Sequence, residues 1–355
     1  LARMGQFEKL ISDVPSQLLD VLDEWQRGLP LVPRPFAAIA GAAGLGEGEL
    51  LLGLSRMQQA GVLGRVGATI RPNSVGVSML AAMKVPDGRL EEVARIVNAE
   101  AGVNHNYERE HDINLWFVIA APDTASLEAS VDRIRSASGI DVLELPLERA
   151  YYIDLGFPLR GRRQPGAGPQ ASVLLAPVEG RMGGAVPPLD DDDRRLLQVL
   201  ERGLMLVPRP YHALGADIGL GEAQVIERIS RLTAQGIITR FGFILRHRRL
   251  GFRANAMVVF DVEDARVDAL GEQFAREDFV TLCYRRPRHG ARWPYNLFCM
   301  IHGLERQRVM EQAQLLARSG GLGEHSTAVL FSRRCFLQRG TRIAHHTDIQ
   351  QEAAQ

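Results

Sequence analysis

The stretch LVPRPFAAIAGAAGLGEGEL at residues 31–50 decides the organisation of this chain, because it returns as LVPRPYHALGADIGLGEAQV at residues 206–225. The match continues at the same spacing, since GVLGRVGATI from Gly61 returns as GIITRFGFIL from Gly236. Self-similarity of this length at a fixed spacing is the signature of an internal repeat. The chain is therefore predicted to be a tandem duplication.

Each copy begins with three short predicted helices. In the first copy they are expected at residues 16–27, at residues 36–42 and from the segment GLGEGE to Ala60. Gly61 follows the third helix and would end it with a left-handed cap. A β-ribbon is expected over residues 62–70. Three short helices and a ribbon predict a winged helix-turn-helix.

The remainder of each copy has the pattern of an α+β sandwich. In the first copy MLAAMKV predicts a strand, LEEVARIVNA a helix, and VNHNYER with INLWFVIA a strand pair. A helix at residues 126–137 and a last strand near residues 142–152 follow. This βαββαβ order is the ferredoxin-like split unit, and the second copy repeats it. The predicted fold class is α+β: a tandem duplication of winged helix-turn-helix plus ferredoxin-like βαββαβ sandwich.

The repeat sets the expected domain boundaries. They are a winged helix-turn-helix at 15–75, a ferredoxin-like domain at 76–156, a Pro-, Gly- and Ala-rich linker at 157–188, a second winged helix-turn-helix at 189–250 and a second ferredoxin-like domain at 251–340. We expect the two sandwich halves to pair within the chain as a pseudo-dimer. Further homo-oligomerisation is left open.

Length and charge limit the function. A chain of 355 residues suits two to four domains. Its net charge of zero gives no global attraction to nucleic acid or anionic lipid. No apolar run approaches a membrane span, and the first residues lack a secretion pattern, so we predict a cytoplasmic protein with no membrane partner. All basic residues except Lys9 and Lys84 are arginine, which binds carboxylates at two points.

The predicted recognition helices are poorly suited to DNA. Their first turns carry Glu47 and Glu49 in the first copy and Glu222 in the second. Carboxylates there favour the helix dipole but repel phosphates. DNA binding is therefore not expected, although a ligand-responsive regulator remains the alternative function.

Arginine, histidine and aromatic residues concentrate in matching segments of the two copies. They are Arg246 and His247 at the end of the second ribbon; Tyr284, Arg285, Arg286, His289 and Trp293 in the second sandwich; and His105, Tyr107, Arg109 and His111 in the first. Alternation along the strand places His105, Tyr107 and Arg109 on one face. Such a set suits a flat ligand with many carboxylates, and also single-stranded RNA. A solvated basic loop and a histidine bonded to a carbonyl are the structural alternatives.

The two-domain unit resembles the leucine-responsive (Lrp/AsnC) regulators. More specifically, HNYEREHDINLWF in the first copy, and LRHRRLGFRANAMVVF, CYRR and WPYNLFCMIHG in the second, resemble the two subunit types of the siroheme decarboxylases. The resemblance covers residues 15–152 and 188–339, with both subunit types fused in one chain. It implies loss of CO₂ from two acetate side chains of siroheme, giving 12,18-didecarboxysiroheme in heme d1 or alternative heme biosynthesis.

The resemblance also implies roles for the clustered side chains. Losing CO₂ leaves electron density on the methylene carbon, where an imidazolium can supply a proton and arginine cannot. His105 and His247 are the predicted catalytic residues. The predicted substrate-binding residues are Arg246, Arg285, Arg286, Arg109, Tyr107, Tyr284 and Trp293, with His111 and His289 in reserve for either role or for contact with the substrate iron.

The remaining expectations concern cofactors and the number of sites. No separate cofactor and no protein metal site is expected, because the iron arrives inside siroheme. The basic run at residues 246–249 has no counterpart in the first copy, which favours one composite pocket over two equivalent ones. The alternatives are an Lrp/AsnC-type transcription regulator, which would show salt-dependent DNA retention, and a tetrapyrrole carrier without chemistry.

Overall fold

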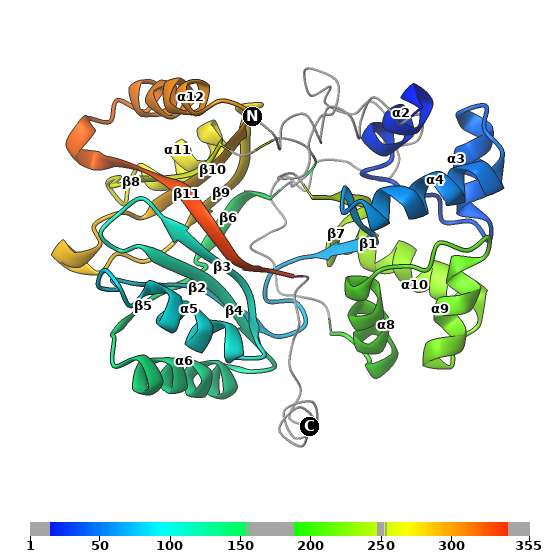
Figure 1. Cartoon of the computed structure of the whole chain (residues 1–355), viewed down its shortest axis with the longest axis horizontal. Helices are drawn as coiled ribbons and strands as arrows, with labels where there is room; N and C mark the ends of the chain where they lie inside the picture. The colour runs from blue at the N-terminus through cyan, green and yellow to red at the C-terminus, as the bar shows by residue number, and fades with distance from the viewer. Residues whose placement is uncertain (1–14, 154–155, 157–187, 247–251, 253, 340–355) are drawn as a thin grey trace. The chain divides into compact units, whose positions relative to one another are not determined.

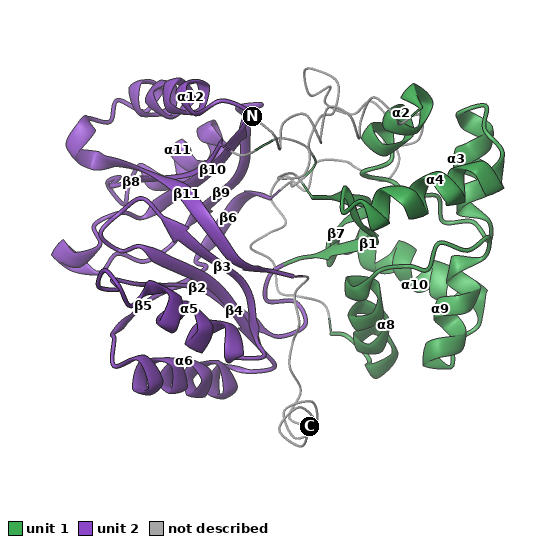
Figure 2. Ribbon diagram, viewed as in Figure 1, with its two compact units in different colours: residues 1–71, 155–252 green, residues 72–154, 253–355 purple. Residues whose placement is uncertain are grey.

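The chain is described by a computed structural model that covers residues 15–153, 156, 188–246, 252 and 254–339 (Figure 1). It divides into two compact units, residues 1–71 with 155–252 and residues 72–154 with 253–355 (Figure 2). Each unit combines the corresponding parts of both copies. The linker expected at 157–188 lies outside the described residues, except for its last residue.

The first unit holds the helices of both helix-turn-helix segments. They are α2 (Ser16–Glu24), α3 (Pro35–Ala42) and α4 (Glu47–Gln59) in the first copy, and α8 (Asp191–Arg202), α9 (Pro210–Ile218) and α10 (Glu222–Ala234) in the second. The first helical residue of α3 and of α9 is a proline, whose missing N–H costs nothing in a first turn. Gly61 has a φ of 74° and follows α4, so the predicted left-handed cap is confirmed.

The ribbon of this unit is shared between the copies. β1 (Leu63–Ile70) pairs antiparallel with β7 (Ile238–Leu245), and the two form a two-stranded sheet. The expectation of a ribbon within residues 62–70 is corrected: each copy supplies one strand. Gly67 and Gly242 face each other at its centre, where a Cβ would lie 2.6 Å and 2.5 Å from backbone atoms of Leu200 and Trp25. These glycines let each strand pack closely on the other copy.

The second unit holds both sandwiches. Its elements are β2 (Val77–Met83), α5 (Leu90–Ala99), β3 (Val103–Arg109), β4 (Leu115–Ala121), α6 (Thr124–Ser138), β5 (Val142–Pro146) and β6 (Arg149–Ile153), followed by β8 (Ala254–Phe260), α11 (Val267–Phe274), β9 (Val280–Arg285), β10 (Leu297–Gly303), α12 (Arg306–Ser319) and β11 (Thr327–Gln338). The predicted βαββαβ order is confirmed in both copies.

The strands form one nine-stranded sheet in the order β5-β2-β4-β3-β11-β8-β10-β9-β6. The two sandwich halves are joined because the last strand segment of each copy pairs with strands of both halves. Residues 327–331 of β11 pair with β8, and residues 332–338 pair with β3 of the first copy. The single strand expected at 142–152 is instead two strands, with β5 on β2 and β6 on β9 of the second copy. The halves are thus paired within the chain, as predicted.

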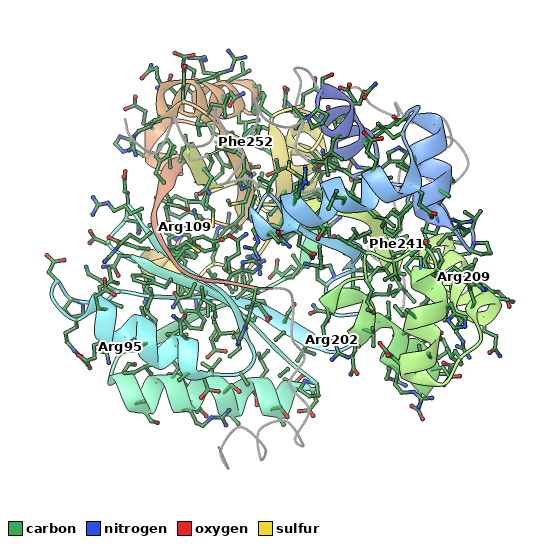
Figure 3. All side chains as sticks on the ribbon, turned by 45° about the vertical axis from the view of Figure 1, so that its right-hand side comes forward. Arg95, Arg109, Arg202, Arg209, Phe241 and Phe252 are labelled. Carbon is green, nitrogen blue, oxygen red and sulfur yellow. The ribbon has the colours of Figure 1, made fainter. Side chains whose placement is uncertain are left out.

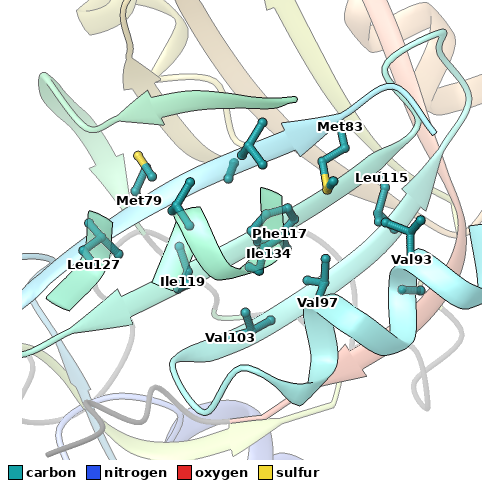
Figure 4. Close-up of a cluster of buried hydrophobic side chains, with 14 of the residues drawn as sticks. Met79, Met83, Val93, Val97, Val103, Leu115, Phe117, Ile119, Leu127 and Ile134 are labelled. Atoms are coloured by element: carbon teal, nitrogen blue, oxygen red, sulfur yellow. The ribbon is translucent and has the colours of Figure 1, made fainter. Parts of the chain in front are cut away.

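Helices cover one face of each half of this sheet. In the first copy Val93 and Val97 of α5 and Ile134 of α6 pack on Phe117 and Ile119 of β4 (Figure 4). An equivalent cluster lies between α11, α12 and the strands of the second copy. The opposite faces of the two halves share a third cluster, which includes Trp116, Leu145, Met257, Trp293, Phe298 and Leu330. This shared cluster is called the interior below.

Candidate active site

The interior face of β3 carries the first group of predicted site residues. Tyr107 lies opposite Trp116 on β4, whereas the intervening Asn106 donates to the Ala94 carbonyl on α5. The predicted alternation is therefore confirmed. The rings of His105 and Tyr107 stack with centroids 6.2 Å apart, and the Arg109 guanidinium lies 5.9 Å from the Tyr107 ring (Arg109 is labelled in Figure 3).

The second copy repeats this arrangement at the end of β9. Tyr284 and Arg286 correspond to Tyr107 and Arg109, and the Arg286 guanidinium lies 5.3 Å from the Tyr284 ring. Each arginine reaches the other copy. Arg109 Nη1 donates to the Leu330 carbonyl at 3.2 Å, and Arg286 Nη1 donates to the carbonyl of Leu145, at the corresponding position of β5. The two copies thus keep the same Tyr-x-Arg contact across their interface.

Arg286 is a buried cation in an apolar environment. Burial lowers the pKa of the Arg286 guanidinium to about 10, and Tyr284 opposes this shift in part. Its guanidinium also lies 5.9 Å from the centroid of the Phe298 ring. Within the described part of the chain its Nε has no hydrogen-bond partner and no carboxylate pairs with it. Since an unpaired buried charge is costly, an anion at this position would be bound strongly.

Trp293 supplies a second buried donor. Its ring is fully buried and contacts Trp116 at 5.1 Å, Tyr295 at 4.9 Å and Phe298 at 6.0 Å between centroids. Its indole N–H has no acceptor among the residues that the structure describes. Buried indole N–H groups usually find a partner. The interior therefore contains two donors, on Arg286 and Trp293, that an acceptor group on a ligand would satisfy.

His111 stands edge-on to Trp293, with ring centroids 5.5 Å apart. Its Nδ1 accepts a hydrogen bond from the Ile113 amide at 3.0 Å, so in the neutral ring the proton lies on Nε2. Burial lowers the pKa of His111, and Asp112 opposes this in part. Near neutral pH the ring is therefore a neutral donor through Nε2–H.

The two arginines approach neighbouring positions of one strand. Arg109 Nη2 lies 3.9 Å from the Met300 sulfur, and Arg286 lies over Phe298. These residues are two apart on the interior face of β10, about 7 Å along the strand. Guanidinium groups from opposite halves thus contact one apolar surface.

Comparison with known proteins decides the family. A family model for a siroheme decarboxylase NirDL-like HTH domain matches residues 20–63 and 193–238, and one for an AsnC-like ligand binding domain matches residues 74–151 and 249–337. The chain is 47% identical over 326 residues to the siroheme decarboxylase NirDL subunit of Paracoccus denitrificans (strain Pd 1222), covering 92% of this chain and 97% of that protein. The chain belongs to the siroheme decarboxylase family.

Other members of the siroheme decarboxylase family match either the whole chain or one half of it. The crystal structure of the siroheme decarboxylase NirDL in co-complex with an iron-uroporphyrin III analogue matches with a TM-score of 0.66 and 27% identity, covering 95% of this chain and 96% of that one. The siroheme decarboxylase NirL subunit of Stutzerimonas stutzeri is 47% identical but covers only 42% of this chain and 88% of that subunit. One such subunit therefore corresponds to less than half of the present chain.

Four predicted site residues are not among the interior contacts that the structure describes. Arg285 faces α11, where its Nε donates to Glu148 at 2.9 Å and Asp264 and Asp268 lie nearby. The other three are His289, which is exposed with Nε2 2.7 Å from the Glu144 carbonyl oxygen; Arg246, which is exposed in the first unit; and His247, which lies outside the described residues. Their roles stay predictions, as do those of the residues that the interior brings together.

Sequence reasoning missed part of the apolar wall. Trp116, Phe298 and Met300 contact the predicted residues, whereas Tyr295, which packs on Trp293, was expected from the sequence to belong to this wall. The three missed residues stand in the motifs that carry the family resemblance, and alternation along LFCMIHG would have placed Phe298 and Met300 on one face.

The helix-turn-helix segments pair their own charges. Glu47 and Glu222, in the first turns of α4 and α10, bind Arg34 and Arg209. On α10, Arg228 and Arg231 bind the buried Asp193 at 2.7 Å and 2.6 Å. Arginines that would otherwise contact phosphates are thus occupied by carboxylates, which disfavours DNA as a ligand for a member of this family.

Metal and membrane signals are weak. Among the described residues no three His, Cys, Asp or Glu side chains gather as a metal site. In that same part of the chain no single helix is long and apolar enough to cross a bilayer; α3 and α4 together pass this test, but with a 100° bend between them.

Proposed function

We propose that this chain is a carboxy-lyase that removes CO₂ from two acetate side chains of siroheme to give 12,18-didecarboxysiroheme for heme d1 biosynthesis. Family membership over nearly the whole chain supports this activity. A related NirDL structure contains an iron-uroporphyrin III analogue, which is an iron tetrapyrrole like siroheme. The iron arrives with the substrate, so the proposal requires no separate cofactor.

The observation that carries the proposal is the buried Arg286. Its guanidinium bonds a main-chain carbonyl and two aromatic rings, and its Nε has no partner in the described residues. A carboxylate of the substrate would complete the charge pair at two points. Arg109, its counterpart on β3, would bind a second carboxylate over the same strand. Tyr107 and Tyr284 would flank the ring of the substrate.

The chemical step follows from the surroundings of the reacting acetate. When its carboxylate leaves as CO₂, the electron pair stays on the methylene carbon and a proton converts that carbon to a methyl group. An apolar wall such as Trp293 and Trp116 favours loss of the carboxylate charge. His105 and His247 are the proposed proton donors. His111 adjoins Trp293 and is neutral near pH 7, so its Nε2–H would donate a hydrogen bond to the substrate and not a proton. The arginines hold the carboxylates that do not react, since they keep their protons.

Anaerobic incubation with siroheme, followed by mass spectrometry, tests this function. Two successive losses of CO₂ from siroheme are the expected result. Retention of intact siroheme on the protein would indicate a carrier. DNA retention that weakens with salt, without any product, would indicate the regulator alternative.

A further inference from the structure

The two arginines of the interior belong to hairpins whose turns differ in length. Four residues separate Arg109 from Asn114 in the first copy, whereas nine residues separate Arg286 from Asn296 in the second. The turns share no sequence pattern. In both copies, however, the strand that follows the turn is entered through an asparagine.

Asn296 binds the main chain of Val262 at two points. Its Oδ1 accepts a hydrogen bond from the Val262 amide at 3.0 Å, and its Nδ2 donates to the Val262 carbonyl at 2.9 Å. Asn296 is only 2% exposed, so both bonds are shielded from water. A side-chain amide that pairs with the donor and the acceptor of one residue is fixed in position and in orientation. Asn296 therefore ties the hairpin to the segment that follows β8.

The main chain of Asn296 holds the arginine across the hairpin. Its carbonyl accepts from the Arg286 amide at 3.0 Å, and its own amide donates to the Phe260 carbonyl at 2.9 Å. Since β9 ends at Arg285, the bond from the Arg286 amide extends the ladder by one residue. Strand alternation is thereby kept, and it directs Arg286 to the interior and Arg285 to α11.

Asn114 makes the same four contacts in the first copy. Its Oδ1 accepts from the Val85 amide and its Nδ2 donates to the Val85 carbonyl, both at 2.9 Å. Its carbonyl accepts from the Arg109 amide at 2.8 Å, and its amide donates to the Met83 carbonyl at 3.1 Å. The two copies thus share the base of the hairpin although their turns differ. They also share the arginine that this base directs to the interior.

We propose that Asn114 and Asn296 are positioning residues for the reaction, each holding the arginine of its own hairpin in the orientation that binds a substrate carboxylate. This inference rests on the proposed function, in which Arg109 and Arg286 bind siroheme. A role limited to folding would act equally with or without the arginine. A positioning role depends on the arginine, because without the guanidinium there is no binding group to orient.

Double-variant cycles in the full-length chain test this inference. Asn296→Ala should lower kcat/KM for siroheme by about 10- to 100-fold, since a misplacement of about 1 Å can cost about 100-fold. In the Arg286→Met background the same substitution should change kcat/KM by less than about threefold. In the Arg109→Met background it should keep its full effect, because Arg109 belongs to the other hairpin. Asn114→Ala should show the reverse dependence.

Asn98→Ala is the matched control. Asn98 lies on α5 and also bonds through both ends of its amide, with Nδ2 donating to the Phe336 carbonyl at 3.4 Å and Oδ1 accepting from Asn106 at 2.9 Å. This substitution should leave kcat/KM of the folded protein unchanged in every background, even where the Tm falls. Absorbance titration with iron-uroporphyrin III as a probe gives the same cycles in Kd.

Equal losses from Asn296→Ala in both arginine backgrounds would overturn the inference and leave the proposed function intact. If the original chain does not turn over siroheme, the proposed function fails, and the cycles in Kd decide the inference by the same criterion. No binding of iron-uroporphyrin III by the original chain would overturn it as well. If the alanine variant does not fold, Asn296→Asp replaces it, because aspartate keeps the acceptor for the Val262 amide and loses only the donor.

Discussion

Replacing Arg286 by methionine should greatly reduce activity but leave the stability of the fold almost unchanged. The substitution keeps the length and apolar stem of the side chain and removes only the charged, hydrogen-bonding end. In the proposed function that end binds a carboxylate of siroheme. In the free protein it is a buried cation whose known partners are one carbonyl and two rings.

The expected change in stability is small because its contributions oppose each other. Burial lowers the pKa of Arg286 to about 10, and with about 1.4 kcal/mol per pKa unit the buried charge costs about 3 kcal/mol. Methionine removes this cost. It also loses a charged hydrogen bond of about 1.5–3 kcal/mol and ring contacts of about 0.5–1 kcal/mol. The free energy of unfolding should therefore stay within about 1 kcal/mol of its original value.

The expected change in activity is large. Leaving a substrate carboxylate buried without its partner costs about 2–5 kcal/mol, which corresponds to a loss of about 30- to 4000-fold in kcat/KM. Anaerobic turnover of siroheme followed by mass spectrometry measures this loss, and urea unfolding measures stability. Arg133→Met is the matched control, because Arg133 pairs with Glu100 on the surface and should affect neither quantity by more than about 1 kcal/mol.

Two results would refute this reasoning. Turnover within about threefold of the original in Arg286→Met would show that the guanidinium does not bind a reacting or anchoring carboxylate. Arg286→Lys covers the case in which the methionine variant does not fold. It keeps the charge but loses the planar two-point geometry, so kcat/KM should still fall by about tenfold; full activity of this variant would contradict the proposed contact.

Three further predictions concern single groups. Burial lowers the pKa of His111, so its neutral form stabilises the fold above about pH 6.5, and this stability is lost as the pH falls. In urea unfolding, His111→Asn should reduce the fall of the midpoint with pH. An unchanged pH dependence would contradict this role of His111. Trp293→Phe removes an N–H that has no acceptor in the described residues. It should lower kcat/KM by about tenfold and the free energy of unfolding by no more than about 2 kcal/mol. Full turnover would exclude a contact between this N–H and the substrate. Burial raises the pKa of Glu201 to about 7 against the opposing effect of Arg65. The protonated form of Glu201 therefore stabilises the fold at low pH, and this stability is lost as the pH rises through 7. Glu201→Gln should abolish the loss of stability between about pH 5 and 8; if the loss persists, another group causes it.

Local patterns in the sequence predicted most elements correctly because those elements are set by neighbouring residues. Alternation placed His105, Tyr107 and Arg109 on one face of β3, and Gly61 ends α4 with a positive φ. The same alternation applied to CYRR separates Arg285 from Arg286, which were grouped only because they are adjacent in the chain. The structure shows Arg285 facing α11 and Arg286 facing the interior.

Pairing between the copies was harder to predict, because periodicity defines a strand but does not name its partner. The sequence gives no local sign that β1 pairs with β7, or that the strand after Val142 divides into β5 and β6 to join two parts of the sheet. The contact between His111 and Trp293 depends on that closure, since the two residues come from different copies. Tertiary contacts of this kind brought the candidate site together.

An anaerobic crystal structure with siroheme bound tests the central claim most directly. The account predicts a substrate carboxylate within about 3 Å of Arg286, another at Arg109, and an acetate group against the wall formed by Trp293 and His111. Siroheme bound with all its carboxylates away from both arginines would contradict the account, whatever activity the protein shows.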